Sequence, residues 1–166
     1  MNYLDIFDNA KVWIKYVHIL NKKYYKNDLL EIGAGIGSFT DQYKKNIQNI
    51  FLTEIDKNNL NILKKKYMND SNVTVVEGEI NKIEQRFNTI CHFNVLEHIK
   101  EDKEEIINCL NKINKNGYLV ILVPAHNKLY SNLDKDVGHY RRYDKSFFYN
   151  LNIFNGKIVE LKYMDC

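Results

Sequence analysis

The 166-residue sequence predicts an α/β fold: a doubly wound, mostly parallel sheet with helices on both faces. Three observations predict it. Short apolar runs alternate with segments of helical periodicity, the connections between them are short, and the first predicted strand ends in a glycine-rich loop. A chain of this length is expected to form one domain, residues 1–166. Ligands of such sheets bind beyond the carboxyl ends of the strands.

The chain is predicted to begin with a capping helix followed by two strand–helix units. Apolar and aromatic residues recur at helical spacing within residues 3–26. The apolar run 29–33 is predicted as a buried strand, and a helix is expected from Ser38 onward. A second strand over residues 50–55 and a helix over 57–68 repeat this order.

The middle of the chain continues the alternation. The β-branched run VTVV at residues 73–76 predicts a third strand, and the apolar run 88–93 predicts a fourth. A helix is expected over residues 101–113. A fifth strand over residues 118–123 is stopped by Pro124, which lacks a backbone N–H.

After the fifth strand comes a loop, residues 124–143, whose length is typical of a functional lid. A helix is expected over residues 144–151, with Asp144 as its N-cap, and a sixth strand over 157–163.

Composition excludes several classes of protein. A net charge of +3 is too small to indicate nucleic-acid binding. No apolar run reaches the ~20 residues of a membrane span, and no secretory signal begins the sequence. Three cysteines (Cys91, Cys109 and Cys166) form no CxxC pair, so neither a disulfide framework nor a zinc site is expected. A reduced, cytoplasmic protein is the simplest interpretation.

The run Glu31-Ile-Gly-Ala-Gly-Ile-Gly37 joins the first strand to the next helix. Glycines there allow a tight turn and close backbone approach to a ligand, while the helix start favours an anion. The dinucleotide fingerprint GxGxxG would need glycine at position 38, which is serine, so a pyrophosphate ligand is disfavoured. A tight turn that binds nothing is the alternative.

Acidic residues follow the next two strands. Glu54 lies 21 residues after Gly33, where a carboxylate can accept hydrogen bonds from both hydroxyls of a ribose. Asp56 is better suited to cap the following helix. After the third strand, Glu79 can accept from an exocyclic adenine amine while Ile80 packs on the ring, although a surface turn would also explain this group.

These elements together resemble class I S-adenosylmethionine-dependent methyltransferases, and among them bacterial small-molecule methyltransferases. The matching segments are LLEIGAGIGSFT (29–40), TEID (53–56), VEGEI (76–80), FNTICHFNVLEHI (87–99), YLVILVP (118–124) and GHYRRY (138–143). The resemblance implies an enzyme that uses S-adenosylmethionine to methylate a hydroxyl, amine or carboxylate of a small molecule. The implied cofactor-binding residues are Glu31, Gly33, Ala34, Gly35, Gly37, Glu54, Ile55, Glu79, Ile80, Phe93 and Asn94.

The resemblance also implies a sheet of seven strands, the last two forming an antiparallel hairpin. The sequence ends at Cys166, near the end of the sixth predicted strand. We therefore expect a domain that lacks the last strand, as a C-terminal truncation would produce.

Methylation of a hydroxyl requires removal of a proton, and histidines are the candidate bases. His139 in the long loop is the first choice and His126, just after the fifth strand, is the second. Tyr130, Tyr140, Arg141 and Arg142 are candidate substrate-binding residues. Arginines can contact a phosphate or carboxylate, but one of them would instead fix the loop if it paired with Asp134 or Asp144.

Three alternatives remain at this point. The run Asn94–His98 resembles the ExxEH run of metal-assisted methyltransferases, but its first position is Asn94, a poorer ligand for a hard cation, so no metal is expected. An RNA methyltransferase is a second function class, disfavoured because residues 94–97 lack the proline and aromatic clamp of those enzymes. A nucleotide-binding module without catalysis is the third.

Overall fold

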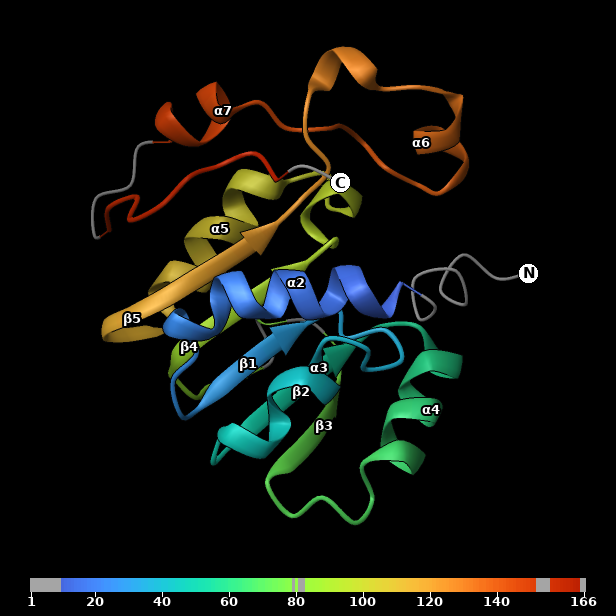
Figure 1. Cartoon of the computed structure of the whole chain (residues 1–166), viewed down its shortest axis with the longest axis vertical. Helices are drawn as coiled ribbons and strands as arrows, with labels where there is room; N and C mark the ends of the chain where they lie inside the picture. Colours follow the sequence, from blue (N-terminus) through green and yellow to red (C-terminus); the bar gives the residue numbers. More distant parts are fainter. Residues whose placement is uncertain (1–9, 79, 81–82, 152–155, 165–166) are drawn as a thin grey trace.

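The computed structural model describes residues 10–78, 80, 83–151 and 156–164. Five parallel strands form one sheet in the order β3-β2-β1-β4-β5 (Figure 1). Their bounds are β1 Leu29–Ile32, β2 Ile50–Glu54, β3 Val73–Glu77, β4 Phe87–Phe93 and β5 Ile113–Leu122. The strand order reverses between β1 and β4, which confirms the predicted doubly wound sheet and places its switch point beside the glycine loop that follows β1.

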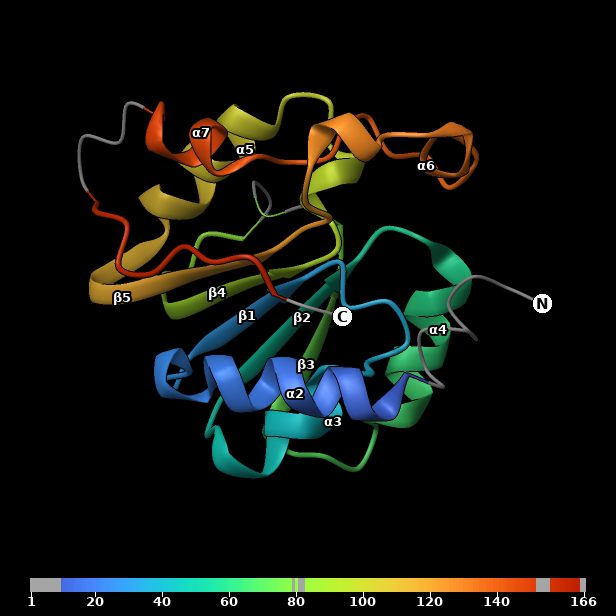
Figure 2. The same cartoon turned by 45° about the horizontal axis from the view of Figure 1, so that its top comes forward.

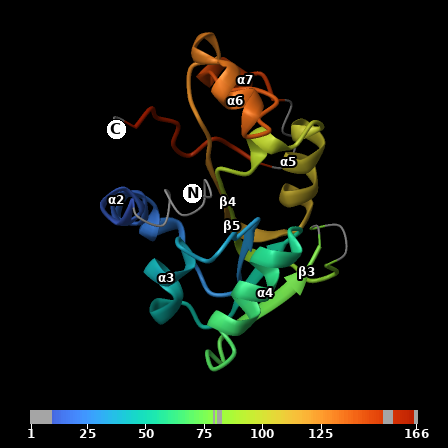
Figure 3. The same cartoon turned by 90° about the vertical axis from the view of Figure 1, so that its right-hand side faces the viewer.

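Helices cover both faces of the sheet, as Figure 3 shows for α2 and α3 on one side and α5 on the other. Their bounds are α2 Lys11–Asn21, α3 Thr40–Tyr43, α4 Lys57–Lys66 and α5 Asp102–Asn111. Adjacent strand residues point to opposite faces, so Leu29 packs with α2, α3 and α4 while Leu30 packs with Cys109 of α5. All four residues of β1 are buried, which explains why three of them are apolar; the other, Glu31, is buried with hydrogen-bond partners.

The start of α4 is fixed by the predicted N-cap. The Asp56 carboxylate accepts hydrogen bonds from the backbone N–H groups of Asn58 and Asn59, at 3.0 and 2.9 Å. By contrast, α3 begins at Thr40, two residues later than predicted, and has only four residues before a 3-10 turn. The capping helix α2 ends at Asn21, five residues before the end of the predicted range 3–26, and a 3-10 turn follows it; residues 3–9 of that range lie outside the described part of the chain.

The long loop after β5 contains short helices. They are η5 Asn127–Leu129, α6 Asn132–Asp136 and, beyond the loop, α7 Lys145–Tyr149. Figure 2 shows α6 and α7 on the same side of the molecule as α5. Asp144 occupies the N-cap position of α7 as predicted, but its side chain makes no capping hydrogen bond. Tyr143 and the two phenylalanines of α7 pack against Leu96 and Ile106.

Residues 157–163, predicted as a sixth strand, form no strand in the structure, and this prediction was wrong. The segment runs alongside β5 (Figures 1 and 2), and a groove lined by side chains of both separates them. Side chains rather than a backbone ladder hold the segment, because Tyr24 donates a hydrogen bond to Glu160 and Lys23 pairs with it at 2.9 Å.

None of the helices in the described ranges combines the length and the apolar character needed to cross a membrane.

Candidate functional site

The glycine loop between β1 and α3 requires its glycines. Gly33, Gly35 and Gly37 have φ values of +63°, +57° and +82°, a region that side chains strongly disfavour. A Cβ atom at Gly33 would lie 2.7 Å from Cγ2 of Val95. The loop backbone therefore packs directly against the segment that follows β4, and it brings the ends of β1 and β4 together.

Glu54, at the end of β2, ties this loop to the sheet. Its Oε2 accepts a hydrogen bond from the Gly35 N–H at 2.8 Å, and its Oε1 accepts from the N–H groups of Ile55 and Asp56, both at 2.8 Å. The Glu54 residue is 6% exposed. An ionised carboxylate has about four acceptor positions, so Glu54 can still accept a hydrogen bond from a ligand.

Glu31, in the middle of β1, points toward α3, the helix that follows the glycine loop. Its Oε2 accepts hydrogen bonds from Thr40 Oγ1 at 2.5 Å and from the Tyr43 hydroxyl. Burial raises the pKa of Glu31 to about 7, although these two hydrogen bonds act to lower it. The carboxyl is therefore close to half-protonated at neutral pH.

This raised pKa leads to a testable pH dependence. The folded chain holds the Glu31 proton more tightly than the unfolded chain, so the resulting stability is fully present below pH 4.5 and is lost as the pH rises through about 7. Between those values the wild type should lose about 3 kcal/mol of unfolding free energy more than Glu31→Gln. Urea unfolding of both proteins at pH 4.5 and pH 8 measures this difference, and parallel profiles would refute it.

Other predicted cofactor residues lie at the carboxyl ends of β2 and β4. Ile55 is 73% exposed beside Glu54. Phe93 stacks on Phe39, with ring centroids 4.4 Å apart. Asn94 has a φ of +55°, a left-handed conformation that asparagine tolerates better than most residues, and its N–H donates to the Leu122 carbonyl.

Two predicted adenine contacts differ in their placement. Ile80 is 1% exposed and belongs to the buried cluster on the α5 face of the sheet. Glu79 lies outside the described residues. The structure thus brings the glycine loop, Glu54 and the end of β4 together, and it places Ile80 within the core.

Asp134 organises the long loop. It forms a capping box with Ser131 at the start of α6, and its Oδ1 accepts a hydrogen bond from Arg142 Nε at 2.8 Å. The same Oδ1 lies 3.0 Å from His139 Nδ1. Burial acts to raise the pKa of Asp134, but hydrogen bonds from Arg142, His139 and Ser131 lower it well below its usual range. Asp134 is therefore a fixed negative charge that orients His139.

A second buried aspartate anchors the other end of the loop. Asp102 Oδ2 accepts hydrogen bonds from Arg141 at 2.6 Å and from the Tyr143 hydroxyl at 2.9 Å. The Tyr140 N–H donates to the Glu97 carbonyl at 2.8 Å. Arg141 is thus paired with Asp102, and Arg142 with Asp134, and both pairs fix the loop. The sequence had left open that one of these arginines pairs with Asp134.

His139 lies beside His98 and Glu97, which follow β4 in the 3-10 turn η4 (Leu96–His98). The two imidazole centroids are 4.7 Å apart. Glu97 is 1% exposed, and its Oε2 has no hydrogen-bond partner among the described residues. Burial raises the pKa of Glu97 to about 8, although a hydrogen bond from its own backbone acts to lower it. Tyr130 donates to the His139 carbonyl at 2.7 Å.

His126, the second candidate base, has a different environment. It is exposed, its backbone has a φ of +62°, and its ring packs on Tyr163 with centroids 4.3 Å apart. It does not join the group formed by Glu97, His98 and His139.

Sequence reasoning named Asp134 only as a possible arginine partner and Glu97 only as part of the run Asn94–His98, and it did not single out Asp102. The pattern Ser131-x-x-Asp134 is a recognisable helix-start signal and could have identified the first of them. The pairing of Asp102 with Arg141 joins residues 39 positions apart and has no local signal.

Comparisons with known proteins agree with this arrangement. A family model described as a methyltransferase domain matches residues 8–154. The ribosomal RNA small subunit methyltransferase A of Pediococcus pentosaceus is 37% identical over 57 residues, which are 34% of this chain and 19% of that protein. The chain therefore spans about a fifth of the length of this relative.

Two solved structures share the fold. A putative methyltransferase from Bacillus halodurans matches with a TM-score of 0.68 and 15% identity, over 86% of this chain and 66% of that one. The glycopeptide N-methyltransferase MtfA complexed with S-adenosyl-L-methionine matches with a TM-score of 0.60 and 17% identity, over 78% of this chain and 58% of that one.

Proposed function

The chain belongs to the methyltransferase domain family, and on this premise we propose that it transfers a methyl group from S-adenosylmethionine to a small-molecule acceptor. The observation that carries the proposal is the glycine loop joined by Glu54 to the carboxyl edge of the sheet. This arrangement places an accessible loop backbone and a carboxylate acceptor side by side, next to the end of β4.

The residues present fit this cofactor. The loop carries no side chain at its three left-handed positions, so a ligand can approach its backbone closely. We propose that Gly33, Ala34, Gly35 and Gly37 hold the methionine part and that Glu31 supports them from below. Glu54 and Ile55 would hold the ribose, Glu79 would accept from the adenine amine, and Phe93 and Asn94 would flank the methyl group. Ile80, buried in the core, would support this end of the sheet rather than pack on the ring. When bound, S-adenosylmethionine supplies an activated methyl group attached to a positively charged sulfur.

The chain must then hold the acceptor in line with the methyl group and take up the proton that the acceptor loses. His139 is the proposed base. Asp134 accepts from its Nδ1–H, which fixes the tautomer in which Nε2 is unprotonated. That nitrogen has no hydrogen-bond partner in the described part of the chain, so it can accept the proton of a hydroxyl or amine. His126 is the second candidate, in its exposed position on Tyr163.

Several features support a small molecule as the acceptor. The loop that carries His139 is fastened over the strand ends through Asp102, Asp134 and the Glu97 carbonyl. Arg141 and Arg142 are already paired with carboxylates, which leaves less positive charge to bind the phosphates of a nucleic acid. The buried, unpartnered Glu97 Oε2 can accept a hydrogen bond from a hydroxyl or amine. Tyr130, Tyr140, Arg141 and Arg142 remain the proposed substrate-side residues.

Methylation of RNA is the second candidate, and the similarity to a ribosomal RNA methyltransferase over 57 residues favours it. Residues 94–97 contain neither proline nor an aromatic side chain to hold a base. A transfer assay with methyl-labelled S-adenosylmethionine separates the two functions. We expect label in small hydroxyl or amine acceptors, with amino sugars and sugars tested first. Label found only in small-subunit ribosomal RNA would replace the first proposal by the second.

A further inference from the structure

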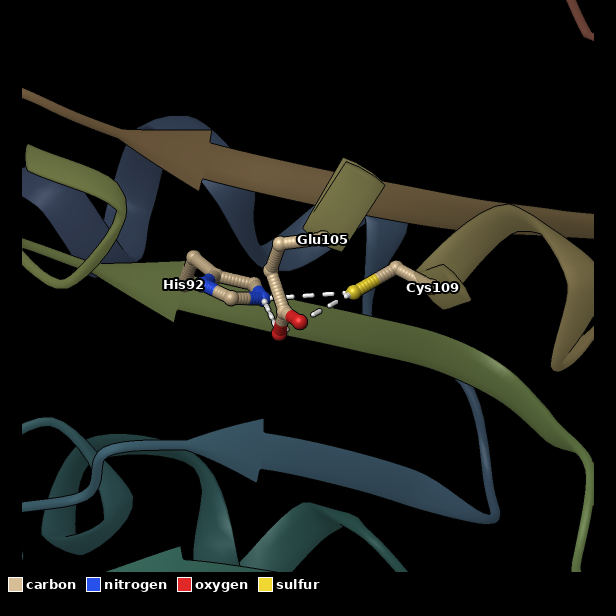
Figure 4. A group of neighbouring side chains, drawn as sticks. All are labelled: His92, Glu105 and Cys109. Carbon is tan, nitrogen blue, oxygen red and sulfur yellow. Dashed lines mark hydrogen bonds and ion pairs between the residues drawn. The ribbon is translucent and has the colours of Figure 1, made fainter. Parts of the chain in front are cut away.

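A buried cluster of three potential metal ligands lies away from the glycine loop, between β4 and α5. His92 is the sixth residue of β4, and Glu105 and Cys109 lie one turn apart on α5, so both face the same strand (Figure 4). His92 is 1% exposed and Cys109 is fully buried, while the Glu105 side chain is 13% exposed. The proposed methyl transfer uses none of the three.

The three ligand atoms form a nearly regular triangle. His92 Nε2 is 3.3 Å from Cys109 Sγ and 3.5 Å from Glu105 Oε1, and the sulfur and oxygen are 3.8 Å apart. A tetrahedral zinc ion lies about 2.1 Å from nitrogen and oxygen and about 2.3 Å from sulfur, which places such ligand atoms about 3.4 to 3.6 Å from one another. Each observed separation differs from this spacing by about 0.3 Å or less.

From this geometry we propose that His92, Glu105 and Cys109 bind one zinc-type divalent cation. Imidazole, thiolate and carboxylate together are a zinc donor set, whereas magnesium and calcium prefer oxygen alone. The partly exposed Glu105 gives the cation a way in and leaves the fourth position for a water molecule. On binding, the Cys109 S–H bond breaks, a sulfur–metal bond forms, and the proton passes to solvent.

Such a cation would fasten α5 to β4, which lies between β1 and β5 in the sheet. His92 precedes Phe93 and Asn94, the residues proposed to flank the methyl group, so the cation would fix the end of the strand that carries them. Spacing rules did not find this site because its ligands come from a strand and a helix, and the helical pair is a Glu and a Cys four residues apart rather than a CxxC.

The test uses the full chain, freed of metal with a chelator and titrated with Co²⁺, then with competing Zn²⁺. We expect one Co²⁺ bound with a near-ultraviolet thiolate-to-cobalt absorption band, and displacement by Zn²⁺. Cys109→Ser should abolish the band and weaken binding by at least about 100-fold. Glu105→Gln, at the partly exposed position, should weaken binding by at least about tenfold and provides a second variant if Cys109→Ser does not fold.

Cys91→Ser is the matched control. Cys91 is equally buried but packs on the opposite face of the sheet with Leu29, so its removal should leave the band intact. Binding without a thiolate band would overturn the proposal, because the cation would then lie at a site without sulfur, of which Glu97, His98 and His139 are one within the described residues. Absence of Co²⁺ and Zn²⁺ binding by the folded wild type would overturn it as well. Neither readout depends on S-adenosylmethionine.

Discussion

Replacing Glu54 by alanine should weaken binding of S-adenosylhomocysteine by at least about tenfold. The one hydrogen bond that the Glu54 carboxylate can still accept from the ribose is worth about 1.5 kcal/mol at the lower end, and about 1.4 kcal/mol corresponds to a factor of ten. The variant also removes the acceptor that holds the Gly35 N–H, so the loop loses part of its fixed shape. Calorimetric titration of the purified variant measures the loss.

Glu77→Ala is the control for this variant. Glu77 ends β3 directly beside Glu54 in the sheet register, but its side chain is exposed and has no proposed contact with the ligand. It removes the same number of charges from the same edge of the sheet and should change the affinity less than about threefold. Equal losses in the two variants would mean that net charge, rather than a specific hydrogen bond, accounts for the effect. Thermal unfolding of both variants confirms that they are folded.

Replacing His139 by glutamine should lower kcat for the acceptor found in the transfer assay by between about 100-fold and 10,000-fold. This is the range that general base catalysis contributes, and glutamine cannot accept the proton in its place. Binding of S-adenosylhomocysteine should persist, because none of the contacts proposed for the cofactor involves His139. Single-turnover rates together with calorimetry separate the two effects.

Two further variants test whether His139 or His126 is the base. Asp134→Asn should lower kcat in the same direction, because the His139 tautomer loses its partner, although it also disturbs the capping box at α6. His126→Gln should lower kcat less than about tenfold, since His126 lies outside the group around His139. A large loss in His126→Gln with a small loss in His139→Gln would assign the base to His126 instead.

The sequence was sufficient for the parts of the fold that depend on local pattern. The apolar run that forms β1 is buried on both faces, so its composition alone predicts a central parallel strand. Asp56 was predicted as an N-cap because its side chain acts within three residues. Glu54 was selected by its position at the end of β2, although its bond to the Gly35 N–H depends on how the loop folds back.

The parts that failed or were missed depend on distant neighbours. The alternating pattern of residues 157–163 is compatible with a strand but does not supply a partner, and the structure leaves the segment beside β5 without a ladder. Asp102 and Arg141, and likewise His92 and Cys109, meet only after the sheet has formed. The sequence therefore indicated the strand ends at which the candidate residues lie and offered Asp134 as an arginine partner, but it gave no sign of the pairing between Asp102 and Arg141.

The central claim is that the glycine loop and Glu54 form an S-adenosylmethionine site. Calorimetric titration of the wild-type chain with S-adenosylhomocysteine, and in parallel with NAD, tests it most directly. The account predicts micromolar binding of S-adenosylhomocysteine and no measurable binding of NAD, whose pyrophosphate the GxGxG spacing disfavours. Binding of NAD but not of S-adenosylhomocysteine, or of neither by a folded sample, would contradict it.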